Sequence, residues 1–282
     1  MATTENPPAR LLKSVHDRVG PNAAMLIIGA VGAAVFAGLL TVSTAVYEAV
    51  AESDGISGLD QPVLEWAIRA RTPASEYWVT AFTNLGDTGP MVVMGLVLLA
   101  LLYWYWRRRT ILVLVLVASA GSLVFTAVGK AIVGRKRPPL ADAVPPYEYA
   151  PSFPSGHTLN STVISLAFAY LAVWLSVRLW IRIASVVAAV CWSVAMGLSR
   201  VFLGHHWLTD VVFGWVFGLA WIVLIATVHQ VLLRIERRDE AGAGEVDSRT
   251  DEGRVLEKPP PRDDGAPDVH SEGVPDAEGL GK

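Results

Sequence analysis

The chain has 282 residues, of which 52% are hydrophobic and only 17% are charged. This composition is too apolar for a soluble protein, so it excludes an ordinary soluble globular fold and indicates an integral membrane protein. The net charge of -3 hides an asymmetry, because residues 239–282 carry 13 Asp and Glu against 5 Lys and Arg, whereas residues 1–238 carry 18 Lys and Arg against 13 Asp and Glu. The body of the chain is therefore basic and its tail is acidic.

The first membrane-spanning helix is predicted close to the N-terminus. Residues 1–18 are polar and weakly basic, and an uncharged run follows from Val19 to Tyr47, far longer than the apolar core of a signal peptide. Five further uncharged runs are each near the roughly 20 residues that a helix needs to cross a bilayer. These are Gly89–Trp106, Thr110–Gly129, Thr158–Val177, Ile183–Ser199 and Val211–Leu233. We predict an all-α bundle of six spans over residues 21–235, the fifth span being the shortest, preceded by a cytoplasmic segment over residues 1–20.

The segment between the first and second predicted spans, Glu48–Thr88, is too short for a separate domain. Within it, Asp60–Arg71 and Glu76–Leu85 mix apolar and charged residues at roughly helical spacing and include Trp and Tyr. Both stretches are expected to form short helices. They fit two arrangements equally well, namely helices that lie in the membrane interface and covering elements that pack on the bundle.

Basic residues in the loops indicate how the bundle is oriented. Those between the second and third spans, between the fourth and fifth, and after the sixth all belong to one side: Arg107, Arg108, Arg109, Arg178, Arg182, Arg234, Arg237 and Arg238. With the basic N-terminal segment, they predict that this side is cytoplasmic and that both termini lie inside. We expect a multi-pass protein of a cell membrane, which fits a bacterial inner membrane.

The composition changes after Arg238 to Asp, Glu, Gly, Pro and Ala, and the run Pro259–Pro261 follows. Such a segment cannot bury enough apolar surface to offset the entropy lost when it is ordered. Residues 239–282 are therefore expected to form a disordered acidic tail on the cytoplasmic side.

Three polar stretches interrupt the apolar runs. Lys130–Pro138 follows the third span, Pro154–His157 opens the fourth, and Ser199–Asp210 joins the fifth to the sixth. With the N-terminus inside, the third and fifth spans end outside, where the fourth and sixth begin, so all three stretches are expected together at the outer face. Their basic residues run against the positive-inside rule, and ionisable groups beside hydrocarbon are costly, which predicts a functional site.

The residue types in these stretches suit a phosphate group. Lys130, Arg137 and Arg200 supply cations, and the two arginines can bind phosphate bidentately. Ser155 and Gly156 stand at the predicted start of the fourth helix, where free N–H groups and the helix dipole favour an anion. Positioned cations and amides of this kind stabilise the charge that spreads over a phosphoryl group in its transition state.

A histidine and a carboxylate in the last stretch indicate reactivity. His206 and Asp210 are four residues apart. If the helix of the sixth span reaches back to His206, the two side chains lie on one face, and Asp210 can hold one ring nitrogen while the other stays free. That is the arrangement of an oriented nucleophile or base.

The pattern K-x6-RP, PSGH and SR-x5-H-x3-D resembles the type 2 phosphatidic acid phosphatase superfamily, membrane lipid phosphatases that share their site with vanadium haloperoxidases. The resemblance covers about residues 20–235, and every signature position is filled. It implies that His206, oriented by Asp210, is the nucleophile that takes the phosphoryl group, and that His157 is the general acid. The residues implied in phosphate binding are Lys130, Arg137, Ser155, Gly156 and Arg200. No metal or other cofactor is needed in this scheme.

Other polar residues near the motifs have simpler interpretations. Arg135 and Lys136 are expected to snorkel to lipid headgroups, and His205 to be a satisfied residue at a helix end. A metal site built from the two motif histidines and Asp210 is chemically possible, but the three cations nearby would repel a divalent ion.

We therefore predict an enzyme that hydrolyses a lipid phosphate or diphosphate at the outer face, among membrane lipids and without a nucleic-acid partner. A polyprenyl diphosphate such as undecaprenyl diphosphate is the first candidate, because an outer site suits the recycling of a carrier lipid; phosphatidic acid and phosphatidylglycerophosphate are alternatives. Two other functions stay open. Halide oxidation with bound vanadate is one, against which six spans argue, and a non-catalytic transporter or scaffold for anionic lipids is the other. The sequence leaves the oligomeric state open.

Overall fold

The computed structural model describes residues 21–256, and every regular element in that range is helical. Six helices are long and apolar enough to cross a membrane. They are α2 (Pro21–Glu52), α5 (Thr88–Trp106), α6 (Arg109–Val133), α7 (Gly156–Leu175), α8 (Leu179–Phe202) and α9 (Leu208–Leu256). The predicted all-α, six-span bundle is thus confirmed, while the expected cytoplasmic segment 1–20 lies outside the described residues.

The fifth span is longer than its uncharged run indicates. Helix α8 begins at Leu179, so it includes Arg182, and it continues past Arg200 to Phe202. The Arg182 Nε donates to the carbonyl of Ser176 at 2.8 Å, which holds this guanidinium at the end of the bundle. Because a charged side chain near the end of a span can reach toward water, an uncharged run underestimates the length of its helix.

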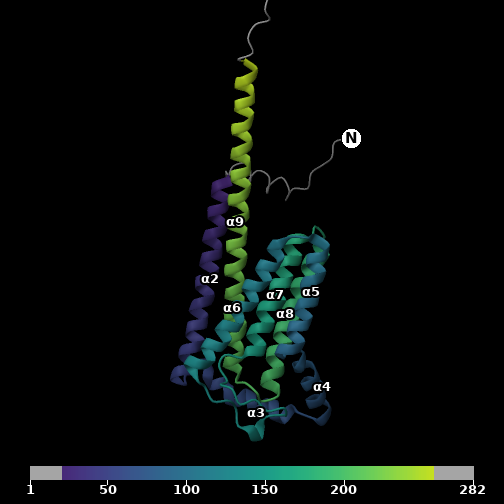
Figure 1. Cartoon of the computed structure of the whole chain (residues 1–282). Helices are drawn as coiled ribbons and strands as arrows, with labels where there is room; N and C mark the ends of the chain where they lie inside the picture. Colours follow the sequence, from purple (N-terminus) through teal and green to yellow (C-terminus); the bar gives the residue numbers. More distant parts are fainter. Residues whose placement is uncertain (1–20, 257–282) are drawn as a thin grey trace, which may run out of the picture. The chain divides into compact units, whose positions relative to one another are not determined.

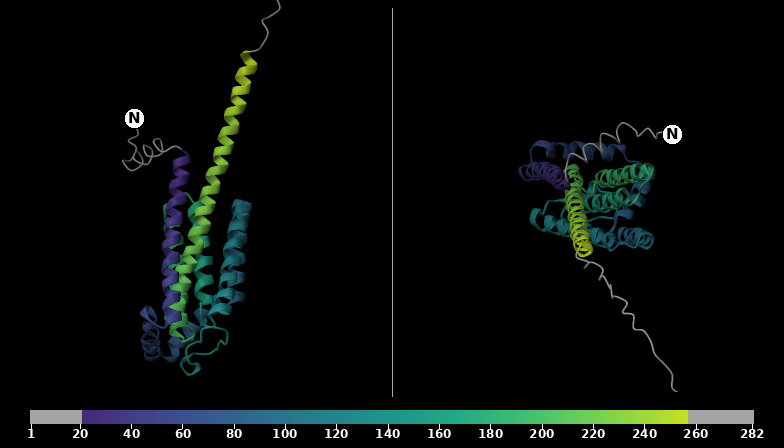
Figure 2. Two further views of the ribbon diagram at one scale, coloured as in Figure 1. Left: turned by 90° about the vertical axis from the view of Figure 1, so that its left-hand side faces the viewer. Right: turned by 90° about the horizontal axis from the view of Figure 1, so that it is seen from above.

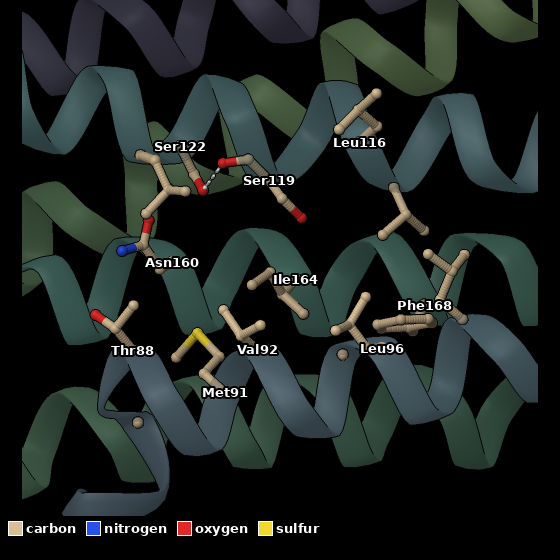
Figure 3. Close-up of a pocket in the computed structure, with 15 residues that line it drawn as sticks. Thr88, Met91, Val92, Leu96, Leu116, Ser119, Ser122, Asn160, Ile164 and Phe168 are labelled. Atoms are coloured by element: carbon tan, nitrogen blue, oxygen red, sulfur yellow. Dashed lines mark hydrogen bonds between the residues drawn. The ribbon is translucent and has the colours of Figure 1, made fainter.

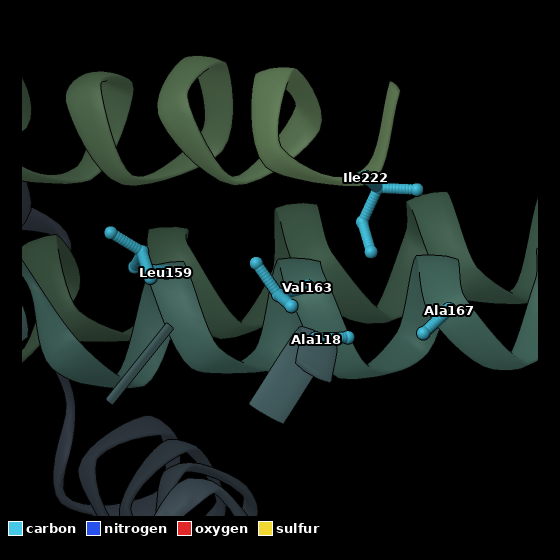
Figure 4. Packing of buried hydrophobic residues seen from close by; sticks show 5 residues of the cluster. All are labelled: Ala118, Leu159, Val163, Ala167 and Ile222. Atoms are coloured by element: carbon cyan, nitrogen blue, oxygen red, sulfur yellow. The ribbon is translucent and has the colours of Figure 1, made fainter. Parts of the chain in front are cut away.

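The core of the bundle lies around α7. Ala118 of α6, three residues of α7 and Ile222 of α9 form a buried apolar cluster between these helices (Figure 4). The three residues of α7 are Leu159, Val163 and Ala167. Helix α7 also packs along α8. Since lipid tails are as apolar as these side chains, the helices associate through close packing more than through hydrophobic burial.

Short elements connect the long helices at one end of the bundle. Between α2 and α5 lie the 3-10 turns η1 (Gly55–Leu59) and η2 (Asn84–Gly86) and the helices α3 (Asp60–Ala70) and α4 (Pro73–Thr83); η3 (Leu140–Asp142) lies between α6 and α7. Figure 1 shows α3 and α4 at the end where α6 and α8 finish and α7 and α9 begin, and Figure 2 gives the same arrangement from two further sides. We call this the site end.

The two short helices predicted before the second span are present. Both α3 and α4 pack on α8, and Leu64 and Ala67 of α3 are buried. Trp66, Tyr77 and Trp78 on the same two helices are exposed. The helices therefore pack on the bundle as covering elements, which is one of the two expected arrangements. The other, in which their exposed aromatic side chains lie in the membrane interface, stays a prediction.

The C-terminal segment is helical over part of its length. The compact unit of the chain ends at Ile235, and helix α9 is assigned as far as Leu256. The disordered tail expected over residues 239–282 stays a prediction. Residues 257–282 lie outside the described residues.

We expect Gly121→Ala to destabilise the bundle by about 1–3 kcal/mol, the usual cost of overpacking. A Cβ at Gly121 in α6 would lie 2.4 Å from Cζ2 of Trp221 in α9. That indole cannot move away easily, because its Nε1 donates to the carbonyl of Ala118 at 3.2 Å. The measurement is the melting temperature of the purified protein in detergent.

The matched control is Gly38→Ala in α2, where an added Cβ would meet nothing within 4 Å. Alanine is the better helix former, so this variant should melt at the wild-type temperature or above it. Equal melting temperatures for the two variants would contradict the packing assigned to Gly121.

Candidate active site

The three polar stretches of the sequence meet at the site end. Helix α6 ends at Val133 with Gly134 in the left-handed region at φ 58°, and the chain then turns back over the bundle to the start of α7. Helices α8 and α9 are joined by a tight turn in which Gly204 has φ 72°. A Cβ at Gly204 would lie 2.5 Å from the carbonyl oxygen of Asp142, so only glycine fits between the turn and the loop above it.

His206 and Asp210 form a buried pair at the start of α9. The Nδ1 of His206 lies 3.3 Å from Oδ2 of Asp210, and its Nε2 lies 3.1 Å from Nη1 of Arg137. Because a guanidinium can only donate, Nε2 must accept, so the ring proton belongs on Nδ1, facing the carboxylate. Burial, followed by the charges of Arg137 and Arg200, holds the pKa of His206 well below its usual value. The ring is therefore neutral, with its Nε2 lone pair directed at the cations.

Asp210 has more partners than the sequence analysis expects. Its Oδ2 also accepts from the hydroxyl of Ser152 and from the backbone N–H of Trp207 at 3.0 Å. Its Oδ1 accepts from Nη1 of Arg135 at 2.6 Å. The carboxylate is completely buried and is held from three sides. It can therefore hold the imidazole of His206 in one orientation.

Arg135 is not a snorkelling residue, which corrects the expectation. Its guanidinium lies between two carboxylates, 2.6 Å from Asp210 and 2.7 Å from Asp60 of α3. Asp60 in turn accepts from the N–H and the hydroxyl of Thr209 at 2.9 and 2.7 Å. A charged side chain near the end of a span snorkels to water only when no buried partner is available. Arg135 has such a partner, because the fold places α3 and its Asp60 beside the guanidinium.

Of the three predicted cations, Arg137 contacts Nε2 of His206, and the charges of Arg200 and Lys130 also act on this ring. Arg137 donates to the carbonyls of His205 and Ala150, both at 2.6 Å, and Lys130 donates to the carbonyl of Pro151. The Arg200 side chain is only 2% exposed and donates to Oγ1 of Thr83 at 3.2 Å. Its Nε is buried without a partner in the described part of the chain. A buried donor of this kind is available for an anion.

A carboxylate already lies between the two arginines. Glu148, in the loop before α7, pairs with Nη2 of Arg137 at 2.7 Å and with Nη2 of Arg200. Burial by itself would raise the pKa of Glu148, but the charges of Arg200 and Arg137 lower it to about 2. Glu148 is thus ionised near neutral pH. Its carboxylate lies between Arg137 and Arg200, where another anion could also bind. The sequence analysis does not single out this residue.

The start of α7 supplies the backbone part of the site. Ser155 is the N-cap, and its buried Oγ accepts from the hydroxyl of Thr158 at 2.9 Å. The side chain of Ser155 therefore caps the helix, while Gly156 begins it. A Cβ at Gly156 would lie 3.1 Å from Cγ2 of Thr126, so the lack of a side chain keeps α6 and α7 close there.

His157, one residue further, has a carboxylate partner that the sequence analysis misses. Its Nε2 lies 2.9 Å from Oδ1 of Asp87, the residue before α5. The expected satisfaction of His205 holds for one nitrogen only, because its Nε2 lies 2.6 Å from the carbonyl of Val144 while its buried Nδ1 has no hydrogen-bond partner in the described part of the chain. Burial, followed by the charge of Arg200, lowers the pKa of His205 to about 4. Among the described residues, no three His, Cys, Asp or Glu side chains are grouped as a metal ion would need.

An apolar cavity of about 230 Å³ opens beside His157 between α5, α6 and α7 (Figure 3). Its walls are mainly aliphatic, including Leu96, Leu116 and Ile164. Gly86 lines its end nearest the site, and a Cβ at that position would lie 2.8 Å from Cδ2 of His157. The polar centre and the apolar cavity are therefore adjacent.

Comparisons with known proteins agree with this geometry. A family model described as the PAP2 superfamily matches residues 110–234, a range that contains all three motifs. Phosphatidylglycerophosphatase B of Bacillus subtilis is 27% identical over 194 residues, which are 67% of this chain and 93% of that protein.

Solved structures are also similar. The crystal structure of a transmembrane PAP2 type phosphatidylglycerolphosphate phosphatase from Bacillus subtilis superposes with a TM-score of 0.60 and 26% identity, over 71% of this chain and 96% of that one. The crystal structure of Aquifex aeolicus LpxE has a TM-score of 0.48 and 18% identity, over 59% of this chain and 94% of that one. The family model, the Bacillus subtilis proteins and the six spans support a membrane lipid phosphatase, in which residues 110–234 are similar to the PAP2 superfamily.

Proposed function

We propose that the protein removes phosphate from a lipid phosphate or diphosphate at the outer face of the cell membrane, through a phosphohistidine formed on His206. The observation that carries this proposal is the pair of contacts on one buried imidazole. Its Nδ1 faces Asp210 at 3.3 Å, and its Nε2 lone pair faces Arg137 at 3.1 Å. A binding protein for anionic lipids would have no need for a neutral imidazole aimed into the anion site.

The first step transfers the phosphoryl group to the enzyme. His206 Nε2 attacks phosphorus and forms the N–P bond while the bond to the leaving oxygen breaks. His157, as the imidazolium, gives its proton to that oxygen, so the lipid product leaves as an alcohol or as a lipid monophosphate. Asp210 accepts from Nδ1–H and stabilises the positive ring as it forms.

The second step releases inorganic phosphate. His157, now neutral, accepts a proton from a water molecule while the water oxygen attacks phosphorus and the N–P bond of His206 breaks. Both histidines then return to their starting protonation states. Arg137, Arg200 and Lys130 stabilise the equatorial oxygens in both transition states, together with the N–H groups at the start of α7.

Phosphate binding requires that Glu148 give way. Glu148 is paired with both Arg137 and Arg200 and would repel a phosphate dianion. The side chain is 32% exposed and stands in a loop, so it can turn toward water while the arginines stay in place. A lipid phosphate therefore exchanges with an internal carboxylate rather than entering an unpaired cationic site.

The substrate classes follow from the position of the site beside hydrocarbon. The cavity between α5, α6 and α7 suits an alkyl or prenyl chain that enters from the bilayer. A polyprenyl diphosphate such as undecaprenyl diphosphate remains the first candidate, because an outer site suits a carrier lipid. The similarity to phosphatidylglycerophosphatase B supports phosphatidylglycerophosphate as the second candidate, and phosphatidic acid is the third.

The first test is phosphate release by purified protein in detergent with EDTA, using a panel of these three lipids. We expect the wild type to release phosphate, and His206→Ala to lose on the order of 10³-fold or more in kcat, as enzymes do when a nucleophile is removed. Rapid acid-free quenching should trap an alkali-stable, acid-labile phosphoenzyme in the wild type only. The values of kcat/KM rank the substrates.

His16→Ala is the control, because it removes a histidine that belongs to none of the three motifs. The His206 variant should remain folded, since Asp210 keeps its contacts with Arg135, Ser152 and Trp207. Lipid binding without phosphate release by the wild type would favour the transporter or scaffold instead.

We expect Glu148→Gln to bind orthovanadate, a mimic of the phosphoryl transition state, about tenfold more tightly than the wild type. The amide keeps the size of the side chain but removes the negative charge that competes for Arg137 and Arg200. A tenfold change corresponds to about 1.4 kcal/mol, which is less than the roughly 4 kcal/mol of interaction between two unit charges about 4 Å apart near a protein surface. The measurement is the inhibition constant at fixed pH and salt.

Glu52→Gln, an exposed position at the end of α2, removes the same charge away from the site and should leave inhibition unchanged. Weaker inhibition of the Glu148 variant would contradict the competition and would mean that the carboxylate holds the arginines in their binding positions.

The proposed orientation can be tested with single cysteines in a Cys191→Ser background. Tyr149 at the site end is 82% exposed, and Val177 in the loop between α7 and α8 is 91% exposed. In intact cells, we expect a membrane-impermeant maleimide to label Tyr149→Cys, and to label Val177→Cys only after permeabilisation. The reverse pattern would place the active site on the cytoplasmic side.

A further inference from the structure

Asp87 occupies the position of a helix cap without acting as one. It is the N-cap residue of α5, where aspartate normally accepts a hydrogen bond from the backbone N–H two or three residues later. Its side chain makes no such bond. Instead, Oδ1 lies 2.9 Å from Nε2 of His157, a residue 70 positions later in the chain. The carboxylate is thus directed to the site and away from its own helix.

The backbone on either side of Asp87 is fixed against the same histidine. A Cβ at Gly86 would lie 2.8 Å from Cδ2 of His157 and 2.6 Å from Sδ of Met196 in α8. The N–H of Asp87 donates to the carbonyl of Asn84 at 3.2 Å, and its own carbonyl accepts from Met91 at 3.0 Å. The carboxylate therefore stands on a packed turn, which can hold it in one place while the substrate binds.

The contact determines which ring nitrogen of His157 can serve the reaction. An ionised carboxylate only accepts, so Nε2 must donate to Asp87, and Nδ1 is left to exchange a proton with the substrate. Asp87 is the carboxylate that contacts this ring directly, at 2.9 Å. Glu148 must move when phosphate binds, and Asp87 then remains as the negative partner of the charged ring.

We propose that Asp87 is a positioning residue for His157, holding Nε2–H so that Nδ1 of the imidazolium protonates the leaving oxygen. The inference rests on the proposed function, in which His157 is the general acid. The site then has two imidazoles, each with a carboxylate of its own: His206 with Asp210, and His157 with Asp87. One pair serves the nucleophile and the other serves the leaving group.

The test is Asp87→Asn, measured with esters whose leaving groups differ in their need for a proton. Phosphatidic acid releases an alkoxide that must be protonated, whereas p-nitrophenyl phosphate releases a stable phenolate. General acid catalysis is commonly worth 10²- to 10⁴-fold, and weakening its support should lower kcat/KM for phosphatidic acid by about 10- to 100-fold. We expect kcat/KM for p-nitrophenyl phosphate to change less than about threefold, because kcat/KM reports only the transfer to His206 and not the second step that both esters share.

The Asp87→Asn variant is expected to fold, because asparagine is as good an N-cap as aspartate. The lost ion pair contributes little to stability, because the Asp87 side chain is 52% exposed to solvent. Asp87→Glu, which keeps the charge, should recover part of the lost kcat/KM for phosphatidic acid. Asp54→Asn is the matched control, since Asp54 is also an N-cap at the site end without a side-chain cap bond.

The outcomes for the Asp87 variants and for His206→Ala test different claims, namely the role of Asp87 and the phosphohistidine on His206. Equal losses with both esters would mean that Asp87 has only a structural role, and unchanged or faster turnover of phosphatidic acid would also overturn the inference. Activity that survives His206→Ala would instead refute the proposed phosphohistidine. In protein labelled with ¹⁵N-histidine, the ring shifts of His157 should change in Asp87→Asn and not in Asp54→Asn, whichever lipid is hydrolysed.

Discussion

The structure of the site depends on the bonds to the buried carboxylate of Asp210, which lies where the apolar bundle meets the charged residues of the site. A buried carboxylate is costly unless its oxygens are bonded, and breaking a buried ion pair typically costs about 3–5 kcal/mol. Here Arg135, Ser152, the N–H of Trp207 and His206 supply the partners. These contacts tie the end of α6, the loop before α7 and the start of α9 together. The same bonds that stabilise the charge therefore also hold the imidazole of His206, the proposed nucleophile.

The second constraint is that three cations stand close together beside hydrocarbon. Arg137 and Arg200 would repel each other in the free enzyme, and Glu148 between them offsets that repulsion. Under the proposed function, a permanent carboxylate there would block phosphate, but one in a partly exposed loop can be displaced. In that proposal, the arginines are stabilised without substrate by the same kind of charge that a phosphate would supply.

The sequence predicts the fold and the motif residues but not the residues that orient them. Six apolar runs determine the bundle, and their parity brings the three motifs to one end. Asp60, Asp87 and Glu148 lie outside the motifs, and their partners are 11 to 149 residues away in the chain. No local spacing indicates such contacts. Arg135 is misinterpreted for the same reason, because its position at the end of a span is typical of snorkelling and only the fold reveals its buried partners.

The segment between α2 and α5 belongs to the active site as much as the motifs do. Asp60 of α3 reaches His206 through Arg135 and Asp210, and Asp87 at the start of α5 contacts His157 directly. Each histidine thus depends on one carboxylate from this segment, which lies wholly before the region matched by the family model. Because α3 and α4 also pack on α8, which carries Arg200, a displacement of these short helices would disturb the cations and both histidines together.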